Sequence, residues 1–379
     1  MDKANLALAQ YLLQQGVEVH IVSHSVDQEI SKHPLAKVHL ARLPGGMFSV
    51  GEPLLDWKGR KVARSVRNRW PNAPVVVNGG NCIWPGINWV HYVHHAWRTE
   101  VAQAPLLYRM KSAAFNSRDR KRERAALQRA RLVITNSRRT SQDVVEHLEV
   151  DERKVHTIYL GSDPKWGLVT PEERNAARLE LQIPESRPLV VFVGALALDH
   201  RKGFDVLLQA WQKLCSASDW DADLLVAGAG NALGMWKASV SRAGLVERIR
   251  FLGFSNQIKS VLAAADLLVS PVRYEAYGLN VQEAICRGVP CVVSACAGVA
   301  EQYPAGLYPM LLPDPNDVSD LVARLLNWRA EIEHWKDRFR PVGEELRQNT
   351  WPKMAERIVA LVQERWTQGH ERKEVGSLG

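Results

Sequence analysis

The feature that most constrains the fold of this 379-residue chain is a repeated alternation of short apolar segments with segments of helical periodicity. The apolar segments have the length of strands, and between them apolar residues recur every three or four positions. The segment at 188–194 is apolar almost throughout, which is typical of a strand covered on both faces of a parallel sheet. We therefore predict an α/β protein with doubly wound parallel sheets.

The alternation occurs in two blocks of similar size, which predicts two Rossmann-like domains. The first block covers residues 1–165, and a stretch rich in glycine, proline and charge leads into the second block at 166–350. We expect a helix at about 351–366 to pack back on the first block, and residues 367–379 have the composition of a polar tail.

The first block begins unusually for a parallel sheet. Its first elements are a helical pattern at 4–15 and an alternating strand at 17–22, whereas such a domain normally places a strand and a tight turn before its first helix. We expect either that the N-terminal domain lacks its first strand or that the recorded start lies too far downstream.

The charge of the chain is concentrated in the first block. The net charge is +8, but residues 1–165 hold 25 Lys and Arg against 15 Asp and Glu, while residues 166–379 hold 24 against 26. A basic half indicates an anionic partner such as phosphate, a membrane surface or nucleic acid. No apolar run is long enough to span a bilayer, no signal segment opens the chain, and the five cysteines lack disulfide or zinc spacing, so we expect a cytoplasmic protein.

Parallel sheets bind ligands at the carboxyl ends of their strands, which draws attention to the residues after each strand of the second block. Gly194 ends the strand at 188–194, and Arg201 and Lys202 precede the next helix. Two cations beside a helix N-terminus suit a diphosphate, because the backbone N–H groups add to the side-chain charge. Two solvated loop charges are the alternative interpretation.

Two later strand ends give weaker signals. The turn A-G-A-G-N at 227–231 includes Gly228 and would allow a ligand to approach the backbone closely. F-L-G-F at 251–254 ends in Phe254 and could offer backbone groups to a base edge or be plain core. Neither segment identifies a ligand by itself.

The segment Y-E-A-Y-G-L-N-V-Q-E-A at 274–284 places Glu275 and Glu283 eight residues apart on either side of Gly278. Asn280 can cap the following helix, and Glu283 three residues later then fits a capping box, which is a structural explanation for that glutamate. Glu275 has no comparable explanation. Two carboxylates that flank free N–H groups suit a ligand with phosphate between two polyhydroxylated parts, such as a nucleotide sugar.

These motifs resemble those of the retaining glycosyltransferases of family 4, which have the GT-B fold of two Rossmann-like domains facing across a cleft. The resemblance rests on E-x7-E followed by A-x-x-x-G-x-P, on F-V-G followed by R-K-G-F-D-V-L-L-Q-A, and on A-G-A-G, F-L-G-F and A-D-L-L-V-S-P in the family's order. T-N-S-R-R-T-S and K-V-H-T-I-Y-L-G-S-D in the first block, with T-W-P-K-M-A-E-R near the end, extend it over most of the chain.

The resemblance implies roles for individual residues. Glu275 would contact the transferred sugar, Glu283 would bind the ribose hydroxyls, and His94, after the strand predicted at 89–93, would face the donor sugar from the first block. Taken alone, a histidine at a strand end is more often structural. The residues implied to bind the rest of the donor are Arg201, Lys202, Leu279 and Asn280 at the diphosphate, together with Gly194, Gly228, Phe254, Tyr277 and Gly278.

The implied activity is transfer of a hexose from a nucleotide diphosphate sugar to a hydroxyl of a glycan, lipid or lipid-linked saccharide, with retention at the anomeric carbon. No side chain is an evident nucleophile, so the implied reaction is front-face, with the departing diphosphate as acceptor of the proton. No metal and no other cofactor would be required, because the cations and the helix N-terminus take that role. Nucleic acid is not an expected partner.

Two departures from the family pattern leave an alternative open. The family usually has an arginine where this chain has Ala195, so Arg201 would have to supply that charge, and the first strand with its glycine-rich loop is absent. A degenerate protein of this fold would bind nucleotide or glycan without turnover. An epimerase or phosphorylase is a third reading, but no pattern points to a pyridoxal phosphate lysine.

Three other features have competing interpretations. Residues 109–131 hold nine Lys and Arg against two acids and would suit the anionic inner face of a membrane, or form a solvated helix face. Asp219, Asp221 and Asp223 form D-x-D pairs that resemble a metal motif, but they precede a strand, on the side of the sheet opposite the expected ligand. A group of tryptophans at 84, 89 and 97 suits core packing better than sugar stacking.

Overall fold

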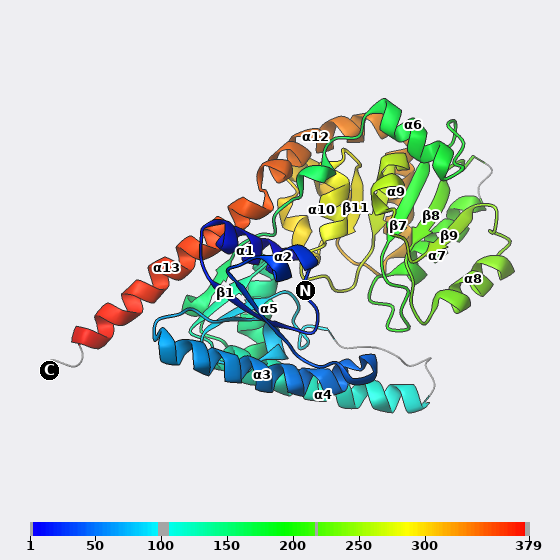
Figure 1. Ribbon diagram of the computed structural model, residues 1–379. Coiled ribbons are helices and arrows are strands. Elements are labelled where there is room, and N and C mark those ends of the chain that lie inside the picture. The colour runs from blue at the N-terminus through cyan, green and yellow to red at the C-terminus, as the bar shows by residue number, and fades with distance from the viewer. Residues whose placement is uncertain (1–2, 98–105, 217–218, 376–379) are drawn as a thin grey trace. The chain divides into compact units, whose positions relative to one another are not determined.

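The computed structural model describes residues 3–97, 106–216 and 219–375. The chain divides into two compact units (Figure 1). Unit 1 comprises Met1–Arg98, Leu107–Gly161 and Asn349–Gly379, and unit 2 comprises Thr99–Leu106 and Ser162–Gln348. The division between Gly161 and Ser162 lies a few residues before the boundary predicted at 165.

Unit 1 contains two separate parallel sheets. One is the pair β1-β2 and the other is four-stranded, with the order β3-β4-β5-β6. In the described part of the chain no strand joins β1 to β3, so the single doubly wound sheet predicted for this unit is divided. Its elements are α1 (Lys3–Gln14), β1 (Val19–Ser23), α2 (Gln28–Lys32), β2 (Ala36–Leu40), α3 (Phe48–Arg69), β3 (Val76–Val77), β4 (Ile87–Val90), α4 (Leu106–Arg129), β5 (Leu132–Thr135), α5 (Arg138–Leu148), β6 (Val155–Thr157) and α13 (Trp351–Val375).

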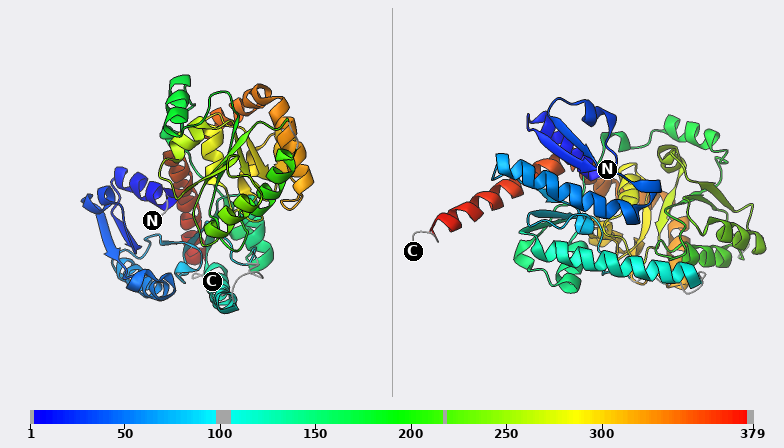
Figure 2. Two further views of the ribbon diagram at one scale, coloured as in Figure 1. Left: turned by 90° about the vertical axis from the view of Figure 1, so that its right-hand side faces the viewer. Right: turned by 60° about the horizontal axis from the view of Figure 1, so that its bottom comes forward.

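Helices α3 and α4 run side by side (Figures 1 and 2). Arg118 of α4 pairs with Glu52 of α3, and one turn further along both helices Arg122 lies 3.5 Å from Asp56. The constant offset between these pairs means that the two helices are parallel, with their N-terminal ends on the same side. Within the basic segment at 109–131, Arg118 and Arg122 thus lie at the contact with α3, and the other basic side chains are exposed or partly exposed.

The last helix closes unit 1 and is longer than predicted. Helix α13 packs against α1, and Gly161 allows its first turn to come close, because a Cβ at Gly161 would lie 2.6 Å from the Cα of Trp351. The helix continues to Val375, so residues 367–375 of the predicted polar tail are helical, and residues 376–379 lie outside the described part of the chain.

Unit 2 contains one parallel sheet of six strands in the order β12-β11-β10-β7-β8-β9. The chain builds outward from β7 in one direction through β8 and β9, and then returns to β10 on the other side of β7. The order therefore reverses between β7 and β10. Its elements are α6 (Pro171–Glu180), β7 (Leu189–Val193), α7 (Phe204–Cys215), β8 (Asp223–Ala227), α8 (Leu233–Arg242), β9 (Ile249–Gly253), α9 (Ile258–Ala264), β10 (Leu267–Ser270), α10 (Leu279–Cys286), β11 (Cys291–Ser294), β12 (Leu311–Leu312), α11 (Val318–Ala330) and α12 (Ile332–Gln348).

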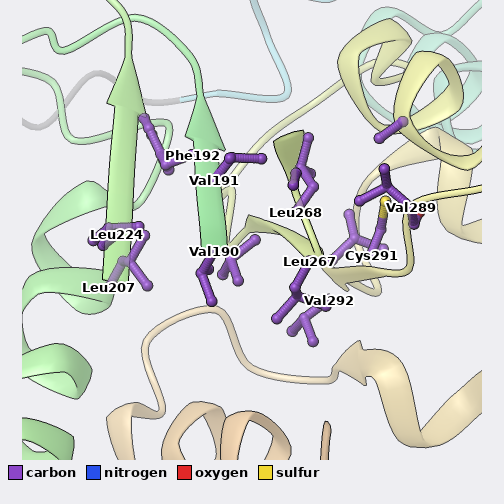
Figure 3. Packing of buried hydrophobic residues seen from close by; sticks show 14 of the residues in the cluster. Val190, Val191, Phe192, Leu207, Leu224, Leu267, Leu268, Val289, Cys291 and Val292 are labelled. Carbon is purple, nitrogen blue, oxygen red and sulfur yellow. Dashed lines mark hydrogen bonds between the residues drawn. The ribbon is translucent and has the colours of Figure 1, made fainter. Parts of the chain in front are cut away.

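A single buried cluster holds unit 2 together. It includes apolar residues of β7, β8, β10 and β11, such as Val190, Leu224, Leu267 and Val292, which point away from their strands toward the helix layers (Figure 3). All four residues of β10 and all four of β11 are buried, as expected for central parallel strands covered on both faces. The α/β prediction with a doubly wound sheet is confirmed for this unit.

Candidate functional site

The candidate site lies at the carboxyl ends of β7 and β10, where the strand order of unit 2 reverses. Such a switch point is where open parallel sheets bind ligands, because the loops from the two strands leave in opposite directions and open a crevice. The loop after β7 carries Arg201 and Lys202, and the loop after β10 carries Glu275. The topology thus brings three of the predicted site residues to one edge of the sheet.

Glycines let the strand ends pack closely at this edge. A Cβ on Gly228, after β8, would lie 1.8 Å from the carbonyl oxygen of Gly194, after β7, so no other residue fits at 228 without a shift of the backbone. The N–H of Gly194 donates to the carbonyl of Ala227 at 3.1 Å, which extends the pairing of β7 and β8 beyond the strands. Gly194 and Gly228 therefore form a compact floor of backbone groups.

The loop that carries the two cations has an unusual backbone. His200 has φ +52°, a left-handed conformation that is rare outside glycine, and Gly203 has φ +71°. A Cβ on Gly203 would lie 1.8 Å from the carbonyl oxygen of Pro271, after β10. This close approach places Arg201 and Lys202 directly beside the loop that follows β10.

Lys202 and Glu275 form an ion pair across the switch point. Their side chains are 20% and 18% exposed, so the pair is partly screened from water but can be reached from it. From the sequence, Glu275 has no structural partner, and the structure corrects this: its carboxylate accepts from the Lys202 ammonium. The two residues lie 73 positions apart, and only the fold brings them together.

The backbone of Glu275 is also fixed. It forms a parallel bridge with Ala297, after β11, and its carbonyl accepts the N–H of Gly298 at 3.1 Å. The carbonyl of Tyr277 accepts the N–H of Val299 at 2.7 Å. The segment between β10 and α10 is therefore held on both sides, by the loop after β7 and by the loop after β11.

Helix α10 begins two residues earlier than a cap at Asn280 would place it. Its N-cap is Gly278, with φ +112° and no side-chain cap, whereas Asn280 lies inside the first turn and donates from Nδ2 to the carbonyl of Val193 at 2.9 Å. The capping-box explanation for Glu283 is therefore wrong. The first N–H groups of the helix, at Leu279 and Asn280, have no acceptor within the helix, as at any helix start, and they point out of its N-terminal end.

Three further predicted residues differ in their surroundings. Glu283 is only 9% exposed and lies in the buried part of α10. Tyr277 is 2% exposed and its hydroxyl donates to Gln282, so its side chain is engaged in the interior and a donor contact could come only from its backbone. Phe254, after β9, is 80% exposed and presents its ring to solvent.

Arg273 is a residue of this region that sequence reasoning missed. Its guanidinium donates to both carboxylate oxygens of Asp205, in the first turn of α7, at 2.8 and 2.7 Å, and to the carbonyl of His200 at 2.6 Å. A signal was present, because Arg273 precedes Glu275 by two positions, but arginines in loops are common and the sequence does not reveal the partner.

In unit 1, His94 lies in a turn four residues after β4 ends at Val90, and not at the strand end predicted at 93. Helix α4 holds this turn. The buried carboxylate of Glu123 accepts the N–H of His94 at 2.8 Å and Nδ1 of His95 at 2.8 Å, and Nε of Arg120 donates to the carbonyl of His94 at 3.0 Å. Desolvation raises the pKa of Glu123 and lowers that of His95.

Two of the three aspartates that resemble a metal motif, Asp221 and Asp223, are engaged by arginines. Arg329 donates to both oxygens of Asp221 at 2.6 Å, which lowers the pKa of that carboxyl, and Arg187 lies 2.8 Å from Asp223. Within the described residues no group of three or more histidine, cysteine or acidic side chains is arranged to hold a metal ion. Trp89, in the tryptophan group of unit 1, is fully buried, in accord with core packing.

Family models match both parts of the chain. Residues 3–166 match the model described as glycosyltransferase family 4, and residues 173–338 match the model described as glycosyl transferases group 1. A curated relative, 2-deoxystreptamine glucosyltransferase from Streptomyces kanamyceticus, is 31% identical over 216 residues, which cover 55% of each chain. The chain spans about half the length of the curated relatives it matches.

Solved structures show the same fold over nearly the whole chain. WaaG, a glycosyltransferase involved in lipopolysaccharide biosynthesis, is 20% identical and superposes with a TM-score of 0.71 over 94% of this chain and 95% of its own. HepE from Anabaena, solved in complex with UDP-glucose, is 16% identical, with a TM-score of 0.70 over 96% of each chain. The GT-B fold expected from the sequence is confirmed.

Proposed function

This chain belongs to the group 1 glycosyltransferases of family 4, and on that premise we propose that it transfers a hexose from a nucleotide diphosphate sugar to an acceptor hydroxyl with retention at the anomeric carbon. The observation that carries the proposal is the meeting of Lys202 and Glu275 at the switch point of unit 2. A cation for the diphosphate and a carboxylate for sugar hydroxyls are thereby adjacent. The binding of UDP-glucose by HepE, which has the same fold, supports a nucleotide sugar as donor.

In the proposed donor complex, Lys202 and Arg201 bind the diphosphate together with the N–H groups of Leu279 and Asn280 at the start of α10. The diphosphate competes with Glu275 for the Lys202 ammonium. Donor binding therefore releases the carboxylate of Glu275 to accept hydrogen bonds from the hexose. Glu283 binds the ribose hydroxyls, and the exposed ring of Phe254 lies against the base.

The chemical step that we propose needs no nucleophile from the protein. The bond between the anomeric carbon and the diphosphate oxygen breaks, and a bond from the acceptor oxygen forms on the same face of that carbon. The acceptor proton passes to the departing diphosphate, whose charge the cations and helix N-terminus stabilise. His94 contributes from unit 1 by hydrogen bonding to the hexose. We propose that these groups make a metal ion unnecessary, in which case activity persists in excess EDTA.

The basic face of unit 1 supports a membrane-associated acceptor, a lipid or lipid-linked saccharide on the inner face of a membrane. Helices α3 and α4 together carry 14 Lys and Arg against 4 Asp and Glu. Large apolar side chains are exposed on both helices, including Trp57 (58%) in the middle of α3 and Leu107 (80%) and Met110 (64%) in the first turns of α4. Such a surface binds anionic headgroups and inserts apolar side chains among them. No helix in the described ranges is long and apolar enough to cross a membrane.

The membrane proposal is tested by sedimentation with phosphatidylglycerol and phosphatidylcholine vesicles. We expect binding to the anionic vesicles, at least a tenfold loss of that binding in the double variant Trp57→Ser, Leu107→Ser, and no loss in Leu179→Ser. Leu179 is the matched control because it is 83% exposed but belongs to unit 2. The proposal is contradicted if the protein binds equally to the two vesicle types. It is also contradicted if the double variant binds the anionic vesicles as well as Leu179→Ser does.

A second candidate is a protein of the same fold that binds its nucleotide without turnover. The observation in its favour is Ala195, at the position where the family usually has an arginine. Incubation with UDP-, GDP- and ADP-sugars separates the two candidates. A glycosyltransferase slowly hydrolyses its own donor, and Lys202→Met abolishes that release of nucleoside diphosphate. If the protein binds a nucleotide but neither hydrolyses any donor nor transfers its sugar to any acceptor, the second candidate is favoured.

A further inference from the structure

Arg273 connects the two loops of the candidate site more extensively than any sequence motif indicates. Its backbone N–H donates to the carbonyl of Arg201 at 2.9 Å, and Nη1 of its guanidinium donates to the carbonyl of His200 at 2.6 Å. These two acceptors are the residues directly before Lys202. Arg273 lies in the loop after β10, which also presents Glu275, and binds the backbone of the loop that presents the cations.

The remaining donors of Arg273 anchor it on two further elements. Nη1 and Nη2 donate to the two oxygens of Asp205 in the first turn of α7, and Nε donates to Oδ1 of Asn316, before α11, at 2.8 Å. A bidentate arginine–carboxylate pair fixes the plane of the guanidinium, and the partly buried position of both side chains limits competition by water. The contact with His200 is therefore made from a rigid support.

The loop needs such support because its conformation is intrinsically unfavourable. His200 is in the left-handed region at φ +52°, where its Cβ crowds the backbone, and its carbonyl must point toward the loop after β10. The hydrogen bond from Arg273 to that carbonyl stabilises this conformation over the ordinary one. A flip of the peptide after His200 would turn Arg201 and Lys202 away from Glu275.

We propose that Arg273 is a positioning residue of the donor site: it holds the loop at 199–203 so that Lys202 meets both Glu275 and the donor diphosphate. This inference rests on the proposed function, since it assigns Lys202 to the diphosphate. Arg273 itself does not contact the donor. It acts through the left-handed backbone at His200.

The chain provides a matched control at the opposite ends of the same strands. Arg178 of α6 donates to Oδ2 of Asp266, just before β10, at 2.8 Å, and to the carbonyls of Ala264 and Pro184. Arg178 is buried and, like Arg273, donates hydrogen bonds both to an aspartate and to backbone carbonyls. It differs in lying at the amino ends of the strands. A purely structural role for Arg273 predicts that equivalent changes at both positions have equivalent effects.

The experiment compares Arg273→Lys, Asp205→Asn and Arg178→Lys in the full chain, by calorimetric titration with whichever of UDP, GDP and ADP the unmodified protein binds most tightly. We expect Arg273→Lys and Asp205→Asn to weaken nucleotide binding about tenfold, as loss of charge-assisted hydrogen bonds would. Arg178→Lys lowers the melting temperature with nucleotide affinity kept within twofold. In a Lys202→Met background, Arg273→Lys has little further effect on affinity, because the ammonium that it positions is gone.

A second measurement is independent of any ligand. Amide hydrogen exchange in the ligand-free protein should accelerate at 199–203 in Arg273→Lys but not in Arg178→Lys. Unchanged affinity and unchanged exchange in Arg273→Lys overturn the inference and leave the proposed function standing. The same conclusion follows if Arg273→Lys lowers nucleotide affinity by the same factor in the unmodified protein and in the Lys202→Met background. If the unmodified protein binds none of the three nucleotides, the proposed function and the inference fall together.

Discussion

The two units hold their functional residues in different ways. In unit 2, Lys202 and Glu275 are placed by the carboxyl ends of two central strands, β7 and β10, whose apolar side chains belong to one large buried cluster. In unit 1, His94 lies beyond its strand and is held by side chains of a single helix, Glu123 and Arg120 of α4. The buried apolar residues of unit 1 also form separate clusters. The proposed donor platform of unit 2 therefore rests on fixed strand ends, whereas the geometry at His94 depends on a few polar contacts.

The largest effect should come from the donor platform. Glu275→Gln keeps the shape of the side chain but removes the charge, so we expect kcat to fall at least 100-fold, the scale seen when one electrostatic contact to a transition state is lost. Glu283→Gln should instead raise KM for the donor and change kcat little. Initial rates with a donor sugar distinguish the two outcomes. Glu247→Gln, an exposed change in the same unit, is the control, and full activity in Glu275→Gln would reject the site.

The cores of the two units should respond differently to a cavity. Leu267→Ala, at the first residue of the central strand β10, removes a fully buried side chain from the large cluster, and we expect a cost of about 3–5 kcal/mol. Ile21→Ala, in a smaller cluster at 8% exposure, should cost about 2 kcal/mol because its surroundings can relax into the space. Hydrogen exchange measured separately for each unit gives the loss of stability in both variants. Equal losses would contradict the proposed difference between the two cores.

The polar support of His94 gives an intermediate effect. Glu123→Gln keeps one acceptor for the N–H groups of His94 and His95 but loses the charge, so the turn should loosen. We expect turnover to fall about tenfold with nucleotide affinity unchanged. Calorimetry and initial rates together test this. A weaker affinity for nucleotide would mean that the turn belongs to the donor platform after all.

The smallest effect concerns pH and is expected in unit 1. Burial lowers the pKa of His39, His95 and His156, which all lie in that unit. A lowered pKa in the folded state means that the unfolded chain binds protons first, so this stability is complete above about pH 6.5 and is lost as the pH falls toward the folded values. Between pH 7.5 and 6.0, opening of unit 1 should become roughly threefold more frequent, while unit 2 changes less. Hydrogen exchange corrected for intrinsic rates measures this, and the opposite ranking contradicts it.

The same contrast explains what could be predicted from the sequence. The strand predicted at 188–194 corresponds to β7, Leu189–Val193, within one residue at each end, because a strand covered on both faces of a sheet is apolar almost throughout. Helices α3 and α12 were missed. Pro53 lies inside α3, and Pro341 and Gly343 lie inside α12, so local propensity argued against helix and packing overrode it.

The site was predictable as far as topology and motifs reach. Strand ends and the E-x7-E spacing located Arg201, Lys202 and Glu275, but their contacts were not predictable. The Lys202–Glu275 pair and the Arg273–Asp205 pair join positions 73 and 68 residues apart, and side-chain geometry across two loops leaves no periodic signal in the sequence. The cap predicted at Asn280 is wrong because the helix begins earlier, after Gly278. Glycine can adopt the positive φ that the chain has at this N-cap.

The most direct test of the central claim is a hydrogen-exchange footprint of the full chain with and without a saturating nucleoside diphosphate. We predict protection of the loop at 194–203 and of the segment at 274–284, which includes the start of α10, and loss of that protection in Lys202→Met. Protection confined to other segments, or an unchanged footprint in Lys202→Met, would contradict the placement of the donor at the switch point between β7 and β10.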